Sequence, residues 1–497
     1  MPSSLKPGEV SLNAAQRDRA VGVLVGKACG DALGAAYEFG PPLPADEQVF
    51  MKASAVFGVG EWTDDTSMAI AIAQCTSGAG VLWAPESLDD LVSRWVRWSS
   101  GAPDVGIQTR QILSALGDEP TAQKAREAAL RFYEDNPQRS AGNGSLMRTG
   151  PVAVLSLSKR VDDAMKLARW ISELTHADPE ASDACVLACA TVRHAILQGD
   201  LDALIGLEHL PVDRRDLWAS RYDEAITRTP ADFANNGWVV EAWQAAWSAI
   251  AMTPVPDHDP GSESFACQQF QHTIENAVRG GRDADTVAAI TGMFMGARWG
   301  RSAVPAHWWS ALNGWPGLVA RDLVHLITPI FGRQHKSVHP RWFEHTETHR
   351  APFDADLILG AAGAVTVLDE LEVDAVVSLC ALPSYRSKAI TESGREHHEF
   401  WLIDSDRSDN VNLDFVVHQA AETVARLRRE GKRVLVHCAA GQSRTPTVSA
   451  VYGARLNNSS FNAAWQSLAR TLPVVAPNGA LIGAGEFLAP GPGGIGA

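Results

Sequence analysis

The sequence predicts one multidomain chain with two fold classes in series, an all-α domain followed by an α/β domain. Its 497 residues exceed the size of one ordinary hydrophobic core, so two or three domains are expected. From about residue 15 to 330, apolar residues recur three or four positions apart, as they do in amphipathic helices. From residue 354 onward, short apolar strands alternate with helices, which is typical of a sheet covered by helices.

The elements follow from these periodicities. The helical domain is predicted over 15–330, a polar linker over 331–352 and the α/β domain over 353–488, with flexible tails at 1–14 and 489–497. Helices of the first domain are expected at 64–77, 87–98, 160–174, 180–198, 238–250 and 283–300. The second domain is expected to have strands at 375–379 and 434–436 and helices at 411–430 and 443–456.

Composition and charge exclude several classes of protein. A formal net charge of −15 argues against nonspecific binding to nucleic acid. The sequence holds no run of 18 apolar residues, so we expect no membrane span and no membrane partner. The first residues lack the charged and apolar regions of a signal peptide. Seven cysteines without paired spacing indicate reduced thiols, so we expect a cytoplasmic protein.

Two acidic motifs, each at the start of a predicted helix, indicate a metal site in the helical domain. Residues 61–66 are E-W-T-D-D-T, and residues 280–286 are G-G-R-D-A-D-T. A single acidic helix start is usually only a cap. Two such starts brought together offer oxygen donors that suit Mg²⁺ or Mn²⁺ and do not suit zinc, in sufficient number for two ions. The candidate donors are Thr63, Asp64, Asp65, Asp283, Asp285 and Thr286.

The stretch Val434–Thr445, V-L-V-H-C-A-A-G-Q-S-R-T, indicates a phosphate-binding loop with a nucleophile. An apolar strand runs into a tight turn before a helix that starts near Ser443, and such a turn points backbone N–H groups inward. Arg444 adds a planar fork for two phosphate oxygens. The same positive field lowers the pKa of the Cys438 thiol, and a thiolate beside an anion cradle can attack a phosphate ester. The plainer alternative is a buried core cysteine.

The residues of this loop have distinct expected roles. Ser443 can hydrogen-bond the sulfur and help it leave from a phosphocysteine. The backbone of the turn is expected to hold the phosphate, through Ala439, Ala440, Gly441 and Gln442.

This loop resembles the signature H-C-x-x-G-x-x-R-S/T of the cysteine-dependent protein tyrosine and dual-specificity phosphatases. The resemblance implies hydrolysis through a phosphocysteine, with no cofactor in this domain. It also implies a general acid on a loop about thirty residues before the cysteine, where three aspartates compete. We expect Asp406, which lies 32 residues before Cys438, with Asp404 next and Asp409 third. At least one of the three is expected only to cap the following helix.

The helical half resembles the ADP-ribosylglycohydrolases over roughly residues 18–300. The matching blocks, in family order, are at 26–39, 63–66, 104–106, 142–148, 175–178 and 280–286. The resemblance implies an all-α fold with a dimetal centre that cleaves an N- or O-glycosidic bond at the anomeric carbon of ADP-ribose.

By this resemblance the six donors above match ligands of two Mg²⁺ or Mn²⁺ ions. Glu38 matches an acidic residue at the metal edge, and Asp104 one that faces the distal ribose. The loop with Asn143, Gly144, Ser145 and Met147 suits contact with pyrophosphate or ribose. His176 is expected either to line the same cleft or to be a hydrogen-bonded structural histidine.

The sequence therefore predicts a bifunctional hydrolase. One domain removes ADP-ribose from a protein or small molecule with two metal ions, and an ADP-ribosylated nucleic acid stays among the possible substrates. The other domain hydrolyses a phosphorylated substrate. The alternative is a phosphatase regulated by a non-catalytic helical domain that senses ADP-ribose.

Overall fold

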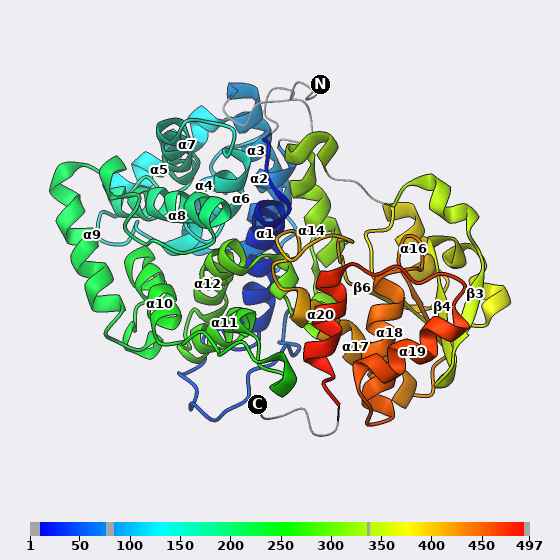
Figure 1. The fold of residues 1–497 in the computed structure, drawn as a ribbon. Helices are drawn as coiled ribbons and strands as arrows, with labels where there is room; N and C mark the ends of the chain where they lie inside the picture. The colour runs from blue at the N-terminus through cyan, green and yellow to red at the C-terminus, as the bar shows by residue number, and fades with distance from the viewer. Residues whose placement is uncertain (1–9, 76–83, 335–337, 492–497) are drawn as a thin grey trace. The chain divides into compact units, whose positions relative to one another are not determined.

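The computed structural model describes residues 10–75, 84–334 and 338–491 of the chain (Figure 1). The chain divides into two units. The first unit comprises the chain up to Pro254 together with Gln269–Gly332. The second comprises Val255–Gln268 together with the chain from Arg333 onward.

The first unit is helical, as predicted, with a two-stranded hairpin of β1 (Asn313–Gly314) and β2 (Leu318–Val319) as its only sheet within the described residues. Each predicted helix is present, with ends within about three residues of those expected; residues 76 and 77 lie outside the described part. Its α-helices are α1 (Ala14–Gly34), α2 (Asp64–Gln74), α3 (Pro85–Ser99), α4 (Ile107–Ser114), α5 (Ala122–Asp135), α6 (Gly150–Leu155), α7 (Val161–Glu173), α8 (Pro179–Gln198), α9 (Val212–Ala225), α10 (Val239–Ala251), α11 (Gln269–Arg279), α12 (Ala284–Trp299), α13 (Ala306–Ala311) and α14 (Ala320–Ile327).

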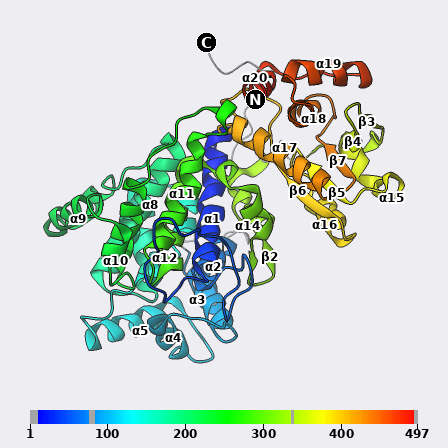
Figure 2. The same ribbon diagram turned by 90° about the horizontal axis from the view of Figure 1, so that it is seen from below.

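Helices α1 and α12 pack with their backbones in contact at the centre of this unit, where Figures 1 and 2 both show them side by side. Glycines on both helices permit this approach. A Cβ atom on Gly30 would lie 2.0 Å from the carbonyl oxygen of Ala288, and one on Gly292 would lie 2.1 Å from that of Gly26. Such distances are far inside van der Waals contact, so only glycine fits there.

The second unit is built on a five-stranded sheet in the order β3-β4-β7-β5-β6. The strands β4 (Asp354–Gly360), β7 (Val434–His437), β5 (Ala375–Ser378) and β6 (Glu396–Glu399) run parallel, and β3 (Thr348–Ala351) pairs antiparallel with β4. Its α-helices are α15 (Leu368–Leu371), α16 (Ser384–Glu392), α17 (Leu413–Arg429), α18 (Arg444–Leu456), α19 (Phe461–Thr471) and α20 (Gly479–Leu488).

Strand β7 is the central strand, with β4 and β5 as its neighbours. Val434, Leu435 and Val436 are fully buried, which explains their continuous apolar run. Because parallel strands end at one edge of a sheet, the loops after β4, β5 and β7 meet there. The loop that follows β7 is the predicted phosphate loop.

The structure corrects the predicted linker and tails. Residues 340–344 form a 3₁₀ turn and residues 348–351 form β3, so the second half of the predicted linker 331–352 belongs to the second unit. Its polar sequence is that of an edge strand, which is bonded on one side only. Residues 1–9 and 492–497 of the predicted tails lie outside the described part. Next to them, the N–H of Val10 donates to Ile330 and the carbonyl of Ala489 accepts from Phe461.

A second correction concerns residues 255–268, which were predicted within the helical domain. They follow α10 and precede α11 along the chain, yet they pack in the second unit. Phe265, fully buried, packs its ring against those of Phe415 and His418 on α17. No local pattern in the sequence indicates that this side chain packs in the second unit.

Among the described helices, none has both the length and the apolar character required to cross a membrane.

We predict that Gly292→Ala destabilises the helical unit, because the added methyl group forces α1 and α12 apart. Overpacking of this kind costs about 1–3 kcal/mol, so the first calorimetric unfolding transition should move to lower temperature. Gly101→Ala is the control, since a Cβ atom at Gly101 meets nothing within 4 Å. An unchanged transition in Gly292→Ala would contradict the close helix packing.

Candidate active sites

Asp31 on α1 organises the start of α2. Its two carboxylate oxygens accept the backbone N–H groups of Thr63 and Thr66, each at 2.8 Å. Thr63, the N-cap residue of α2, makes no capping hydrogen bond with its own side chain. A carboxylate from another helix therefore caps α2 and fixes where the T-D-D-T motif lies. The sequence analysis did not select Asp31; the signal available was a Lys27–Asp31 pair, one turn apart, within an apolar helix.

The predicted donors come together around this capped end. The Thr63 hydroxyl lies 3.4 Å from an Asp65 oxygen and 3.5 Å from an Asp285 oxygen, and the Thr286 hydroxyl donates to Asp65 at 3.2 Å. Ligand atoms of Asp31, Asp65 and Asp285 lie within 4.8 Å of one another, and so do those of Glu38, Asp283 and Asp285. The two groups share Asp285, which is the arrangement that two neighbouring cations require.

The charges of this cluster are poorly compensated by the protein itself. Burial, together with the neighbouring carboxylates, raises the pKa of Asp64 and Asp285 well above its usual value. Burial and the charges of Asp104 and Asp283 raise the pKa of Glu38 to about 8. The Lys27 ammonium group, fully buried, lies 3.7 Å from an Asp65 oxygen.

Among the buried carboxylate oxygens of the cluster, Asp285 Oδ1 has no hydrogen-bond partner within the described residues, and Asp65 Oδ1 has no hydrogen bond but lies 3.7 Å from the Lys27 ammonium group. A buried anionic oxygen without a partner is costly unless a cation meets it. The residues present therefore fit hard divalent cations.

Asp104 and Asp64 lie at the edge of the cluster. The N–H of Gly106, two residues after Asp104, donates to an Asp64 oxygen at 3.2 Å. The Asp104 charge contributes to the raised pKa of both Glu38 and Asp64, after burial. The loop with Asp104 is thus close enough to act on the cluster, from α4's N-terminal side.

The Asn143 loop touches the cluster through one side chain. The Asn143 amide donates to Asp283 at 2.8 Å. Ser145 and Met147, predicted with it as substrate-binding residues, turn into the helical core, where they are 1% and 3% exposed. Asn236, which the sequence analysis did not select, accepts the N–H of Asp283 at 3.1 Å and donates to Gly281 at 3.0 Å.

His176 packs beneath the same loop. Its ring nitrogen Nε2 lies 3.3 Å from where a Cβ atom of Gly142 would be, and Cε1 lies 3.1 Å from that of Gly144. Its Nδ1 is 2.7 Å from the Thr175 hydroxyl. Burial, reinforced by the Arg148 charge, holds the pKa of His176 well below its usual value. These contacts support the structural one of its two expected roles.

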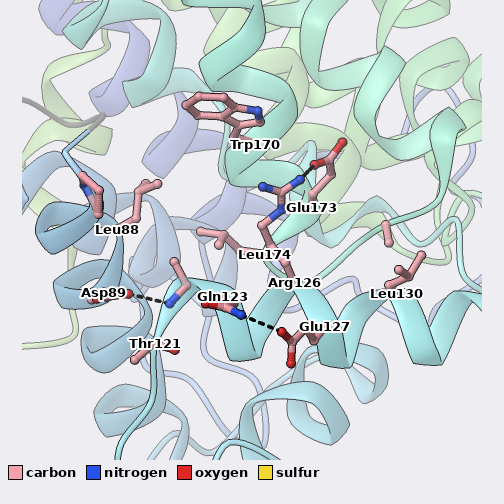
Figure 3. A pocket seen from close by; sticks show the side chains of 13 residues that line it. Leu88, Asp89, Thr121, Gln123, Arg126, Glu127, Leu130, Trp170, Glu173 and Leu174 are labelled. Carbon is pink, nitrogen blue, oxygen red and sulfur yellow. Dashed lines mark hydrogen bonds and ion pairs between the residues drawn. The ribbon is translucent and has the colours of Figure 1, made fainter.

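A hollow of about 870 Å³ lies elsewhere on this unit (Figure 3). Its polar side chains pair with one another, as in Arg126–Glu173 and Gln123–Glu127. Among the described residues that line it, none is a predicted site residue, although Ala177 directly follows His176.

The loop after β7 surrounds the Cys438 sulfur with donors. Burial by itself raises the pKa of this thiol, but the Arg444 charge and hydrogen bonds from Thr445 and the Gly441 N–H outweigh it and lower the pKa. Gly441 has φ 73°, and a Cβ atom there would lie 3.0 Å from the carbonyl oxygen of Gly360. The turn therefore strongly favours glycine at this position. Ala439, Ala440 and Gln442 are partly exposed along it.

Arg444 is fixed on one side and open on the other. Its Nη1 donates to the carbonyls of Leu402 and Leu379, at 2.8 and 3.3 Å. Its buried Nε has no hydrogen-bond partner in the described part of the chain. A guanidinium held in this way keeps donors ready for a phosphate oxygen.

Of the three competing aspartates, Asp404 is the one that reaches this loop. Its Oδ1 accepts the Ser443 hydroxyl at 2.7 Å, and its Oδ2 lies 3.9 Å from Arg444 Nε. The Ser443 hydroxyl thus binds Asp404 in this structure, whereas a bond to the sulfur was expected. Asp406 is exposed. Asp409 accepts the Ser405 hydroxyl within its own loop at 2.6 Å.

A chain of polar side chains in contact with one another supports the phosphate loop at His437. These residues were not selected from the sequence. His437 contacts the Ser378 hydroxyl at 2.7 Å, and Ser378 contacts His397 at 2.8 Å. His397 in turn lies 3.1 Å from the Ser387 hydroxyl. Burial lowers the pKa of His437 to about 3, so the ring beside Cys438 is neutral.

We predict that Thr445→Val raises the pKa of Cys438, because it removes the side-chain hydrogen bond to the sulfur. A hydrogen bond to a charged group is worth about 1.5–3 kcal/mol, which moves the midpoint of iodoacetate alkylation upward by about one to two pH units. Ser449→Ala is the control, since Ser449 is buried on the same helix and makes no hydrogen bond through its hydroxyl within the described residues. The same midpoint in both variants would contradict this assignment.

Comparison with known proteins finds a family match for each of the two units. Residues 12–335 match the ADP-ribosylglycohydrolase family, and residues 357–484 match the catalytic domain of the dual specificity phosphatases. The ADP-ribosylarginine hydrolase Tri1 of Serratia proteamaculans (strain 568) is 30% identical over 321 residues, which are 62% of this chain and 77% of that protein. The ADP-ribosyl-[dinitrogen reductase] glycohydrolase of Rhodospirillum rubrum is 27% identical over 306 residues, 60% of this chain and 90% of that protein.

For the second unit, the solved structure of human DUSP28 is 21% identical and covers 29% of this chain and 93% of its own, with a TM-score of 0.25. The family match over residues 12–335 spans more than half of the chain. The chain belongs to the ADP-ribosylglycohydrolase family and carries a dual specificity phosphatase catalytic domain after the helical unit, and both parts mark it as a hydrolase.

Proposed function

We propose that the helical unit releases ADP-ribose from a protein or small-molecule conjugate with the help of two Mg²⁺ or Mn²⁺ ions. The observation that carries this proposal is the buried oxygen Asp285 Oδ1, which lacks a hydrogen-bond partner in the described residues, together with Asp65 Oδ1, which has the Lys27 ammonium group at 3.7 Å and no hydrogen bond. Both belong to carboxylates that gather within 4.8 Å of other acidic ligand atoms. Oxygen donors without nitrogen or sulfur favour hard cations.

In this proposal each residue has a defined task. The ions would be held by Thr63, Asp64, Asp65, Asp283, Asp285 and Thr286, with Glu38 at their edge. When bound, such ions supply an activated water and hold the ribose hydroxyls. Asp31 keeps the first three donors in position by capping α2, and Asn143 orients the Asp283 carboxylate. Asp104, near the edge of the cluster, would bind the distal ribose.

The linkage we propose to test first is ADP-ribosylarginine, because the Serratia relative is an ADP-ribosylarginine hydrolase. Release from a model ADP-ribosylated arginine peptide, compared with a serine-linked one, measures the preference directly. The alternative, a helical unit that only senses ADP-ribose, predicts binding of free ADP-ribose without release from either peptide.

We predict that Asp65→Asn and Asp285→Asn both lower Mn²⁺ affinity and ADP-ribose release, because each removes a charged ligand. Calorimetric Mn²⁺ titration and release of ADP-ribose measure the two effects. Phosphatase turnover should stay nearly unchanged. Asp213→Asn, at the exposed first turn of α9, is the matched control. If both site variants bind Mn²⁺ and release ADP-ribose as the unaltered chain does, the dimetal proposal is wrong.

We propose that the second unit hydrolyses a phosphomonoester through a phosphocysteine. The Cys438 thiolate attacks phosphorus while Arg444 and the N–H groups of residues 439–443 hold the oxygens. The bond from phosphorus to the leaving oxygen breaks, and a general acid gives that oxygen its proton. Water then attacks the phosphorus of the phosphocysteine and gives a proton to the same carboxylate, while the phosphorus–sulfur bond breaks and releases inorganic phosphate and the Cys438 thiolate. The lowered pKa of Cys438 supports this reaction, since burial alone would raise it.

For the general acid we propose Asp404 in place of Asp406. Spacing along the chain favoured Asp406, but the carboxylate of Asp404 lies next to Ser443 and Arg444, where the leaving oxygen of a bound ester would be. Geometry precedes pKa in the choice of a general acid. Asn478 also donates to Asp404, at 3.2 Å, and so helps to hold it.

We predict that Asp404→Asn lowers kcat for phenyl phosphate about 100-fold or more, within the range of general acid catalysis. Turnover of 2,4-dinitrophenyl phosphate should change much less, because that leaving group needs no proton. Asp406→Asn is the matched control and should behave like the unaltered chain, and Cys438→Ser should be inactive on both substrates. The reverse result, with Asp406→Asn impaired on phenyl phosphate and Asp404→Asn unaffected, restores Asp406 as the acid.

A further inference from the structure

The segment 255–268 is held to the second unit mainly by a buried aromatic contact, because the ion pairs of its exposed residue Glu263 contribute little. Phe265 is fully buried, with its ring centroid 5.5 Å from that of Phe415 and 5.1 Å from that of His418. Glu263 lies 3.3 Å from a nitrogen of Arg455 on α18. Both ends of the segment continue into helices of the first unit, so the phosphatase domain contains a piece of chain that precedes it by about seventy residues.

Asp414, in the first turn of α17, is where this segment meets the loop of the proposed general acid. The Asp414 side chain is only 2% exposed. The guanidinium of Arg407 binds both of its oxygens, at 2.8 and 2.9 Å. The ring nitrogen Nε2 of His258 lies 3.0 Å from Asp414 Oδ2. One buried carboxylate therefore joins a residue of segment 255–268 to a residue three positions after Asp404.

The loop that Arg407 anchors is closed on itself by hydrogen bonds of Asn410. The Asn410 side chain accepts the N–H of Ile403 at 2.8 Å and donates to the Ile403 carbonyl at 2.9 Å. The N–H of Asn410 donates to the Arg407 carbonyl at 3.1 Å. These bonds close residues 403–410 into one loop. Within it, Asp404 contacts the phosphate loop and Arg407 contacts Asp414.

We propose that His258 is a positioning residue for the phosphatase reaction, which acts through Asp414 and Arg407 on the pose of Asp404. The proposal rests on the phosphatase function and the general acid proposed above. A bidentate arginine–carboxylate pair has strict geometry. A third group on the same carboxylate limits its rotation and so the position of the guanidinium. A misplacement of about 1 Å in a proton donor can cost up to about 100-fold in rate.

Segment 255–268 thus supports the loop 403–410, which carries the proposed general acid. A fragment that starts at the predicted linker would lack this segment. We therefore expect the proton-transfer step to depend on this segment, whereas the nucleophile and the phosphate loop do not.

The test uses the full-length chain with single substitutions. The variants are His258→Ala, Arg407→Ala and the conservative His258→Gln, which keeps a donor. Glu263→Gln is the matched control, because Glu263 is in the same segment and contacts Arg455 and His418 without touching Asp414. The measurements are kcat and KM for phenyl phosphate, whose leaving oxygen needs a proton, and for 2,4-dinitrophenyl phosphate, whose leaving oxygen does not.

We expect kcat for phenyl phosphate to fall about 3- to 10-fold in His258→Ala and about 10-fold or more in Arg407→Ala, as partial losses of general acid catalysis. Turnover of 2,4-dinitrophenyl phosphate should stay within about twofold. His258→Gln should recover most of the loss, and Glu263→Gln should show none. In the double variant, the losses of His258→Ala and Arg407→Ala should not multiply, because both act through Asp414.

Three results would overturn the proposal: no loss in His258→Ala, an equal loss on both substrates, or the same loss in Glu263→Gln. In each of them an active unaltered chain leaves the phosphatase function standing. An unaltered chain that hydrolyses neither substrate would instead refute the phosphatase function, and with it the proposed role of His258.

Discussion

The contact between the backbones of α1 and α12 is the constraint on which the helical unit depends. Glycines at 26 and 30 on one helix and 292 on the other let the carbonyl of one helix lie where a side chain would otherwise stand. At this spacing Asp31 of α1 reaches both the N–H of Thr63 and the N–H of Thr66, and so fixes the start of α2 against the start of α12. The carboxylates of two helix starts, more than 200 residues apart in the chain, meet as a result. A wider helix pair would leave the same aspartates too far apart to share a cation.

The two proposed sites use burial in opposite ways. In the helical unit, carboxylates are buried beside one another with the Lys27 ammonium near one of them, and the pKa of Glu38 rises to about 8 because of burial and its acidic neighbours. This arrangement is unfavourable until cations arrive, which couples metal binding to the stability of the site. In the phosphatase loop, Cys438 is equally buried, but Arg444 and inward N–H groups lower its pKa. Here the protein supplies the compensating charge itself, so no metal is needed for the thiolate to form.

The loop that carries the proposed general acid is held in place by chain that is remote in sequence. Residues 403–410 are closed by Asn410, anchored by Arg407 on the buried Asp414, and joined there by His258 of the segment 255–268. A single domain boundary along the sequence would separate residues 255–268 from the unit in which they pack. The phosphatase domain is therefore a spatial unit, and the segment between α10 and α11 belongs to it although the chain on either side belongs to the helical unit.

Much of this protein follows from local sequence, because helical periodicity, buried apolar strands and phosphate-loop chemistry are all short-range properties. The positions of the helices and of the strand Val434–His437 were predictable for this reason, whereas the meeting of Asp65 with Asp283 and Asp285 was expected from the resemblance to a known family. Other long-range contacts were not predictable. Asp31 caps a helix 32 residues away, Ser145 and Met147 turn into the core, Asp404 reaches Ser443 where spacing favoured Asp406, and Phe265 packs in the other unit. Each of these contacts depends on the distance between elements that come together only when the chain folds. No pattern within a single element encodes that distance.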